Sequence, residues 1–460
     1  MLGDHISSLK SLFGEDQSEL RAQENLMMMF HLKDGKVSRN YSTARSGVFA
    51  RVFSGGVFGS SSSAIYDEAH AKAALEHAQR LAREADARCR LGEAPIPKTE
   101  CGFIPLDRSL KPFDMQAHAD LAYELDRYIV EHCPKITHRG VRVRSQSTEK
   151  LLAVTNGYDA HTAIIRAYVD IDLTTEGKDG RPVSIGNYYG KSCYLDEAFS
   201  DIGWVKDSID LLYRQLLDFS IAEYPKAGYH DIILSPDLTG MLAHEAVGHT
   251  VEADGVLGGS IAGLRLGTQV ASEIVTLMDY ANKMPGGDAH CHMIVDDEGT
   301  LCKDVTIIKN GILNSLMHSR QTARNLGGEA CGNTRASQYY DEPMIRMRNT
   351  AIAPGNDTLE DMIASIDDGY YLVGNENGSG ALNGEFIVVT SLGYHIKNGK
   401  IDYPIKGTTI SGSAFDLLKT VSMIGKKQGW RFGGMCGKKQ RIETSNGGPE
   451  IKCKANMAGK

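Results

Sequence analysis

Three residues in the short run HEAVGH, at positions 244–249, have the types and spacing that could do hydrolytic chemistry. The run reads H-E-x-x-x-H, one residue longer than the H-E-x-x-H spacing that puts two zinc ligands and a general base on one helix face. At about 100° per residue, His244 and His249 are offset by about 140° around a regular helix and cannot reach one metal. The spacing therefore predicts either a distorted helix that holds a metal or a solvated helix with two unrelated histidines.

A π-helical bulge would remove the geometric problem, because it absorbs one residue and returns both imidazoles to a common face. We expect it near Val247 and Gly248, since glycine tolerates a distorted backbone. His244 and His249 are then the candidate zinc ligands. Glu245 is the candidate general base that takes a proton from the attacking water. A catalytic zinc needs a third protein ligand and keeps its fourth position open.

Four stretches offer that third ligand, and each also has an ordinary structural explanation. Glu252 and the weaker candidate Asp254 follow the second histidine closely, but either could be a polar residue at a helix end. His290-Cys291-His292 would put two imidazoles on one face of a strand, although such pairs are usually incidental. Cys436 has glycines around it that would let a thiolate approach a metal, but it could equally be a buried free cysteine.

Length and composition restrict the class of protein. A chain of 460 residues is long enough for two or three domains, with ordinary apolar (42%) and charged (23%) fractions. The net charge of -8 argues against nucleic-acid binding as the main role. Apolar runs stay well short of the ~18 residues that cross a bilayer, so no membrane span is expected.

The beginning of the chain and its cysteines indicate a cellular compartment. The N-terminus lacks the basic and apolar regions of a secretory signal. The nine cysteines are an odd number without a C-x-x-C pair, which favours reduced thiols. We therefore expect a cytoplasmic protein.

The elements that would position the candidate residues divide into two regions. Patterns in the first half predict a hairpin at residues 46–59, helices at 67–87, 115–133 and 205–222, and antiparallel strands at 150–155 and 161–173 joined by an Asn-Gly turn. Many glycines and short apolar runs in the second half indicate β-rich structure around one helix at 238–252. The predicted fold class is α+β: a mixed N-terminal region with antiparallel strands, then a β-rich catalytic domain that carries one motif helix.

The domain boundaries that we predict follow the same division. Residues 1–222 form the N-terminal region, with 1–95 and 105–222 as candidate subdomains around a proline-containing connection, and residues 223–460 form the catalytic domain. Two glycine-rich stretches, 255–267 and 374–384, lack both common phosphate-loop patterns, so we interpret them as turns or as loops lining a cleft.

Several ordered motifs together resemble the TldD/PmbA family of metallopeptidases, in its active TldD-like branch. The motifs, which cover nearly the whole chain and are densest from 230 to 440, are HEAVGHTVEAD (244–254), DDEGT (296–300), PMIRMRNT (343–350), GEF (384–386), PIKG (404–407) and GMCGK (434–438). The residues that follow Gly437, Lys438-Lys439-Gln440-Arg441, differ in charge from the family's pattern, which bears on substrate preference.

The resemblance implies roles for residues that spacing alone leaves open. It implies that His244, His249 and Cys436 hold zinc and that Glu245 is catalytic. The PmbA-like branch lacks H-E-x-x-x-H, so retention of the motif implies an active enzyme. It also implies a homodimer, or a heterodimer with an inactive paralogue, and access restricted to peptides or unfolded segments bound by edge-strand pairing.

The resulting hypothesis is a zinc metallopeptidase that hydrolyses peptide bonds with an activated water. Two alternatives remain open at this point: a non-catalytic partner or regulatory protein with a structural metal, and a zinc amidase that acts on a non-peptide substrate. A structural zinc is normally closed by four protein ligands, so a fourth side chain such as Glu252 on the metal would favour the first alternative.

Overall fold

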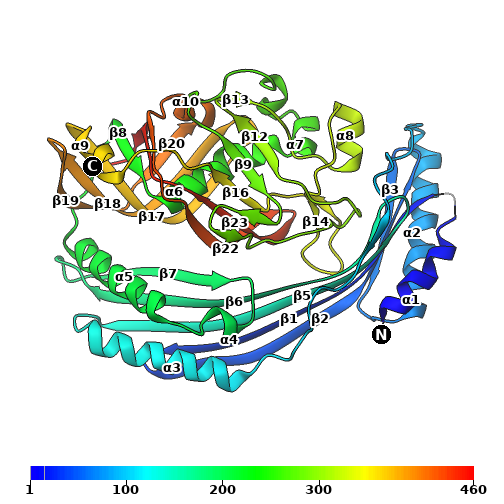
Figure 1. Ribbon diagram of the computed structural model, residues 1–460, viewed down its shortest axis with the longest axis horizontal. Helices are drawn as coiled ribbons and strands as arrows, with labels where there is room; N and C mark the ends of the chain where they lie inside the picture. The colour runs from blue at the N-terminus through cyan, green and yellow to red at the C-terminus, as the bar shows by residue number, and fades with distance from the viewer. Residues whose placement is uncertain (1, 15, 460) are drawn as a thin grey trace.

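The computed structural model describes residues 2–14 and 16–459 and has the predicted α+β class. A long, mostly antiparallel sheet occupies the N-terminal half and runs beneath a C-terminal half built from smaller sheets (Figure 1). The N-terminal sheet has the order β3-β2-β1-β5-β6-β4, with β7 also paired to β6. Its strands are β1 (Gln17–Lys33), β2 (Lys36–Ser54), β3 (Val57–Ser63), β4 (Gly102–Ile104), β5 (His138–Val154), β6 (Tyr158–Glu176) and β7 (Pro182–Lys191).

Helices pack on this sheet through apolar faces, as their sequence periodicity predicts. Leu125 and Ile129 of α3 and Leu212 of α5 share one core with β5 and β6, whereas Leu75 of α2 packs with Val48 of β2. Figure 1 shows α1 and α2 together at one end of the sheet. The bounds are α1 (Leu2–Leu9), α2 (Glu68–Cys89), α3 (Met115–His132), α4 (Leu195–Ala198) and α5 (Gly203–Ile221), with a 3₁₀ turn at Lys10–Leu12.

Turn chemistry explains why the predicted hairpins form. Gly55 and Gly56 both have positive φ between β2 and β3, and Asn156 has φ 58° between β5 and β6. Such φ values are comfortable for glycine and tolerated by asparagine. Both hairpins are confirmed, although the strands extend well beyond the segments that the sequence predicts.

The C-terminal half contains two larger sheets around one extensive apolar core. One has the order β13-β12-β9-β16-β23-β22, so β22 lies at its edge, and the other has the order β17-β8-β24-β20-β18-β19, with β21 paired to β24. The strands are β8 (Gly228–Leu234), β9 (Leu277–Tyr280), β12 (Val305–Lys309), β13 (Ile312–Leu313), β16 (Asn349–Ile352), β17 (Asp368–Gly380), β18 (Glu385–Lys397), β19 (Lys400–Lys406), β20 (Thr409–Ser413), β21 (Met423–Ile424), β22 (Gly429–Lys438), β23 (Gln440–Gly448) and β24 (Ile451–Met457).

Smaller elements complete this half, and they include short helices in addition to the one motif helix that the sequence predicts. The motif helix is accompanied by the short helices α7 (Ala253–Leu257), α8 (Arg320–Leu326), α9 (Leu359–Ala364) and α10 (Ala414–Lys419), which have too few turns to give a clear helical period in the sequence. Two-stranded ribbons join β10 (Lys283–Met284) to β11 (Gly287–Asp288) and β14 (Thr334–Arg335) to β15 (Met344–Ile345). Among the described residues, no helix is long and apolar enough to cross a membrane.

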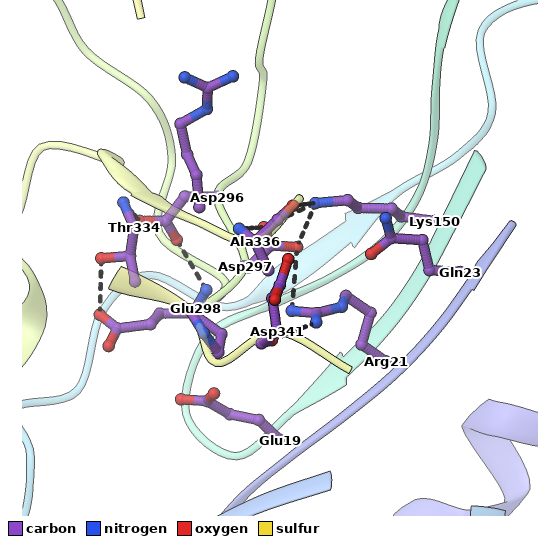
Figure 2. Close-up of polar contacts among 12 residues, drawn as sticks. Glu19, Arg21, Gln23, Lys150, Asp296, Asp297, Glu298, Thr334, Ala336 and Asp341 are labelled. Carbon is purple, nitrogen blue, oxygen red and sulfur yellow. Dashed lines mark hydrogen bonds and ion pairs between the residues drawn. The ribbon is translucent and has the colours of Figure 1, made fainter. Parts of the chain in front are cut away.

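Buried charges join the N-terminal sheet to the C-terminal half. Lys150 of β5 donates to Asp297 at 2.7 Å and to the carbonyl of Ala336, while Arg21 of β1 donates to the carbonyl of Asp341 (Figure 2). Burial alone would raise the pKa of Asp297, but Lys150 and Arg21 outweigh it and lower that pKa. The carboxylate therefore stays charged inside the junction and holds the two halves together.

Arg51 of β2 makes a second connection through two buried carboxylates. Its guanidinium donates to Glu19 at 2.9 and 3.0 Å and to Glu298 at 2.9 Å. All three side chains are at most 11% exposed. Removal of the arginine would leave two uncompensated negative charges in a place from which water is excluded.

We therefore predict that Arg51→Ala lowers the free energy of unfolding by about 3–5 kcal/mol, the usual cost of breaking a buried ion pair on one side. Urea denaturation followed by circular dichroism measures the change. The matched control is Arg83→Ala, because Arg83 pairs with Asp16 at 3.0 Å but is 65% exposed. The control should cost less than about 1 kcal/mol. Equal urea midpoints for the two variants would contradict the prediction.

Candidate metal centre

The motif helix changes its winding within the HEAVGH run. After strand β8, a regular helix α6 (Pro236–Met241) begins with proline in its first turn. It continues as a π-helix over Leu242–Val247 and then as a 3₁₀ turn over Gly248–Val251. The predicted bulge is confirmed, since a π-helix advances one extra residue per turn. The chain over 236–251 therefore combines three windings, as a distorted helix requires.

Glycine is needed beside this bulge for packing and not for backbone freedom. Gly248 has ordinary helical angles, φ -52° and ψ -47°. The prediction that glycine is needed here to tolerate a distorted backbone is therefore wrong. A Cβ at this position would lie 1.9 Å from the sulfur of Met347. Across the helix, a Cβ on Gly380 of β17 would lie 1.7 Å from the carbonyl oxygen of Glu245. The π-turn is therefore held between two surfaces that only glycine lets come so close.

The structure brings the two histidines together with a cysteine that lies 187 residues further along the chain. Ligand atoms of His244, His249 and Cys436 all lie within 4.8 Å of one another, so these three residues could hold a metal ion. Among the described residues, this is the group of three or more His, Cys, Asp or Glu side chains that lie this close together. The sulfur of Cys436 lies 3.3 Å from Nε2 of His249. His244 is 2% exposed, and its Nδ1 is buried without a hydrogen-bond partner.

Electrostatics at this cluster couple the protonation of the cysteine to that of the neighbouring histidine. Burial raises the pKa of the Cys436 thiol, but the charge of His244 and the hydrogen bond to His249 outweigh burial and lower that pKa to about 4. Burial likewise lowers the pKa of His249, but its bonds to Cys436 and Glu252 raise it to about 10. The lowered pKa favours the Cys436 thiolate, the form that ligates metals, and a metal that binds here would displace the proton of His249.

These donors fit a zinc ion. Tetrahedral zinc with bonds of 2.0–2.3 Å needs ligand atoms about 3.5 Å apart, which the 3.3 Å separation of Cys436 and His249 approaches. Two imidazoles and a thiolate are a donor set that zinc favours. The unpartnered Nδ1 of His244 is a buried polar atom that a cation would satisfy. Three protein donors would leave a fourth position for water or substrate.

Glu252 and Asp254 lie behind the cluster rather than in it. Glu252 contacts Nδ1 of His249 at 3.1 Å, on the edge of the ring away from Cys436. Lys438 then donates to Glu252 at 3.0 Å and to Asp254 at 2.7 Å. A carboxylate on the far nitrogen of a ligating histidine fixes the ring and raises its basicity. Both acids thus have a positioning role, and neither belongs to the three-residue cluster.

The His290-Cys291-His292 alternative is wrong, because these residues turn in different directions outside any strand. His290 is buried against the hydroxyl of Tyr168 at 2.8 Å, and burial lowers its pKa well below the ordinary value. The sulfur of Cys291 contacts the carbonyl of Glu443. The stretch serves the junction of the two halves.

A cleft of about 830 Å³ opens in front of the cluster and contains Glu245 and His249. The Glu245 carboxylate lies 3.9 Å from Nε2 of His249 and is 16% exposed, so water can reach it. Both glycine-rich stretches contribute to the walls, which confirms that they line a cleft, but residues 375–380 belong to strand β17 and Gly255 belongs to helix α7 rather than to loops; the lining residues are Gly255, Gly258, 375–380 and Leu382.

Four further cleft residues carry polar groups that sequence reasoning missed: Tyr188, Asn375, Arg431 and Asn446. Tyr188 comes from β7 of the N-terminal sheet, and the other three come from β17, β22 and β23. Their spacing along the chain has no periodic signal. Of the four, Arg431 lies in the same strand as the predicted ligand Cys436, and this proximity in sequence is the one signal that could have identified it.

We predict that Lys438→Met lowers zinc affinity by about 10–100-fold, the usual effect of removing an outer-shell partner. Loss of the ammonium leaves Glu252 without the ion pair that fixes it against His249. Competition with a chromogenic chelator measures the affinity. Lys439→Asn is the matched control, because the neighbouring Lys439 is exposed and its φ of 57° suits asparagine. Equal affinities for the two variants would contradict the role of Lys438.

Comparison with known proteins agrees with the resemblance that the motifs carry. The PmbA/TldA metallopeptidase C-terminal domain matches residues 227–459, and PmbA/TldA metallopeptidase domain 1 matches residues 18–86. A zinc metalloprotease TldD homolog of Saccharolobus solfataricus is 32% identical over 72% of this chain and 71% of its own length. A metalloprotease TldD homolog of Buchnera aphidicola subsp. Schizaphis graminum is 30% identical over 96% of this chain and 92% of its own.

Solved structures share the fold at low sequence identity. TldE from Thermococcus kodakarensis superposes with a TM-score of 0.75 at 18% identity, covering 99% of this chain and all of its own. A Thermotoga maritima protein described as a proposed modulator of a DNA gyrase gives a TM-score of 0.79 at 17% identity, with both chains fully covered. The domain matches, the similarity to the relatives and the shared fold together show that this chain belongs to the TldD/PmbA family of metallopeptidases.

Proposed function

We propose that this protein is a zinc-dependent metallopeptidase that hydrolyses peptide bonds of peptides or unfolded segments. The observation that carries the proposal is the position of Glu245 in an open cleft beside the cluster of His244, His249 and Cys436. A free carboxylate next to three metal donors is the arrangement that hydrolysis by an activated water requires.

His244, His249 and Cys436 would hold the zinc, which when bound would polarise the substrate carbonyl and make water more acidic. Glu252 keeps the His249 ring oriented with its Nε2 toward Cys436. His244 and Cys436 are buried, and the close packing of β17 on the π-turn fixes the backbone of Glu245. The ligands are therefore oriented before substrate binds.

Glu245 would move the proton. One of its carboxylate oxygens accepts a proton from the attacking water and then returns it to the nitrogen of the leaving amine. The carboxylate lies at the cleft surface on the same side as the imidazole of His249, four residues along the chain. The π-turn brings the imidazole of His244 to that side as well, which a regular helix would not do.

The substrate would bind in extended form along β22. This strand carries Cys436 and lies at the edge of its sheet, the position at which an extended peptide can add a strand. A narrow cleft and backbone pairing together favour unfolded segments over folded proteins. We also propose that the chain acts as a homodimer or as a heterodimer with an inactive paralogue, as the family resemblance implies.

Two alternatives make different demands on the site. A structural metal in a non-catalytic regulatory protein needs a fourth protein ligand, whereas Glu252, the nearest candidate, is engaged with Nδ1 of His249 and with Lys438. A zinc amidase for a small non-peptide substrate would not need an edge strand beside the donors. The position of β22 therefore favours the peptidase.

We predict that Glu245→Gln retains zinc but loses at least about 100-fold in cleavage, the contribution expected of a general base. Cys436→Ala should instead lose zinc, because it removes one of three ligands. Metal content by elemental analysis and cleavage of a panel of unstructured peptides by mass spectrometry test both variants against the native protein.

The outcomes separate the proposal from its rivals. Full peptidase activity in zinc-loaded Glu245→Gln protein would refute the role of Glu245. No cleavage of any peptide by the zinc-loaded native protein would contradict the peptidase and favour the structural metal or the amidase. Glu376→Gln is the matched control, because Glu376 is an exposed glutamate in the same cleft without an ion pair among the described residues. It should cleave like the native protein.

A further inference from the structure

We propose that the cleft contains a carboxylate-binding subsite built from Arg431, Tyr188 and Asn375, with Asn446 beside them, about four residues away from the bond that is cleaved. It would recognise a carboxylate of the peptide substrate, either its free C-terminus or an acidic side chain. The proposal rests on the proposed peptidase function and specifies which peptides that site selects.

Arg431 is a cation without an acidic partner in the part of the chain that the structure describes. Its Nε donates to the hydroxyl of Tyr188 at 2.5 Å, and its Nη1 donates to the backbone carbonyl of Asn375 at 2.9 Å. The guanidinium also lies 4.7 Å from the centre of the Tyr188 ring. These contacts fix its orientation and leave Nη2 free to donate. A fixed arginine with a free donor edge is well suited to bind a carboxylate.

The two asparagines supply buried polar groups that lack partners. Asn375 is 8% exposed, and neither its amide oxygen nor its amide nitrogen has a hydrogen bond; Asn446 is 4% exposed, and its amide oxygen has none. Both residues line the cleft. An unsatisfied buried amide costs about 1–3 kcal/mol, so such groups usually serve a ligand or another functional need. The amide nitrogen of Asn375 would donate to a bound carboxylate, whereas the two amide oxygens are acceptors and would take N–H groups of the bound peptide.

Tyr188 adds a further donor. Its hydroxyl oxygen accepts from Arg431, which leaves the O–H free for a ligand. Burial raises the pKa of Tyr188, so the O–H remains protonated at neutral pH. Free donors from an arginine, a tyrosine and an amide, gathered at one place, select an anion over a neutral peptide group.

The other charges of the cleft do not neutralise Arg431. Lys438 is paired with Glu252 and Asp254. Glu245 and His249 lie at the other end of β22, beside Cys436. Glu376 is exposed next to Asn375 but does not approach Arg431 within ion-pair distance. The positive charge of Arg431 is therefore available to a bound anion.

Strand register gives the distance between the subsite and the donors. Arg431 pairs with Asn446, and Cys436 pairs with Ile442, so the two places are four residues apart along β23. At about 3.3 Å per residue this spacing is about 13 Å, which an extended peptide also spans with about four residues. The subsite would thus fix the cleavage position, because it places a carboxylate about four residues from the reacting carbonyl.

Binding to zinc-loaded Glu245→Gln protein, which should hold peptides without cutting them, tests the subsite. Three kinds of N-acetylated fluorescent peptide are based on one unstructured sequence without acidic residues. The first has a free C-terminal acid, the second a C-terminal amide, and the third an amide with one glutamate moved through the sequence as a small series. Fluorescence anisotropy measures each affinity.

We expect a peptide with the correctly placed carboxylate to bind about 10–100-fold more tightly than the amide, the effect of a charged hydrogen bond. Arg431→Gln should abolish this difference, and Tyr188→Phe should reduce it while keeping the ring that contacts Arg431. Lys439→Asn, which removes a neighbouring cleft charge, should leave it unchanged. Tight binding of the acid alone identifies the C-terminus as the source, whereas tight binding of one glutamate peptide identifies a side chain.

Three results would overturn the subsite. The first is equal affinity for all three kinds of peptide, and the second is absence of binding by all of them. The third is a difference in affinity that survives Arg431→Gln in a protein with a native melting temperature. Failure of the proposed function is distinguishable from these results. Carboxylate-dependent binding by a protein whose native form cleaves no peptide would contradict the peptidase and leave the subsite standing.

Discussion

One geometric constraint governs this site: two imidazoles that are five residues apart must face the same point. A π-turn over Leu242–Val247 meets the constraint, but such a turn is intrinsically less favourable than an α-helix. Tertiary contacts have to stabilise it. Met347 packs against Gly248 on one side, and Gly380 of β17 packs against the carbonyl of Glu245 on the other. The glycine-rich end of β17 thus stabilises the π-turn by packing closely against it.

The same constraint explains why residues far apart in the chain meet at the site. The histidines come from a helix after β8, Cys436 comes from the edge strand β22, and Tyr188 comes from the N-terminal sheet. The two halves are joined by buried pairs such as Lys150 with Asp297, so the contribution of β7 to the cleft is held in place by charge. A cleft formed this way depends on the junction as well as on the C-terminal half.

Much of the fold could be predicted from local sequence signals. Asn156 with Gly157 predicted the β5–β6 hairpin, Asp67 predicted the start of α2, and the five-residue spacing of the histidines predicted the bulge. These features depend on turn chemistry, capping and helix geometry, which act over a few residues. The resemblance to a family supplied Cys436, because no local signal connects it to residues so far upstream.

The remaining features depend on three-dimensional packing. The role of Gly248 was predicted from backbone freedom, but its cause is the approach of Met347, which only the folded structure reveals. His290 and His292 were predicted to share a strand face, whereas the chain turns there to reach Tyr168. Arg431 and Asn446 become neighbours only through the β22–β23 register. Sequence alone could not place Glu252 behind His249 rather than on a metal.

The long separation between the histidines and Cys436 has a consequence for how the protein is made. A ribosome delivers the chain from its N-terminus, so the third donor emerges 187 residues after His249, and β23 and β24 emerge after it. A nascent or truncated chain would have the helix and its histidines without the thiolate. A binding site that exists only in the folded state couples metal capture to folding. The order of residues along the chain would thus delay assembly of the three-donor cluster until β22 has been synthesised and has folded against the motif helix.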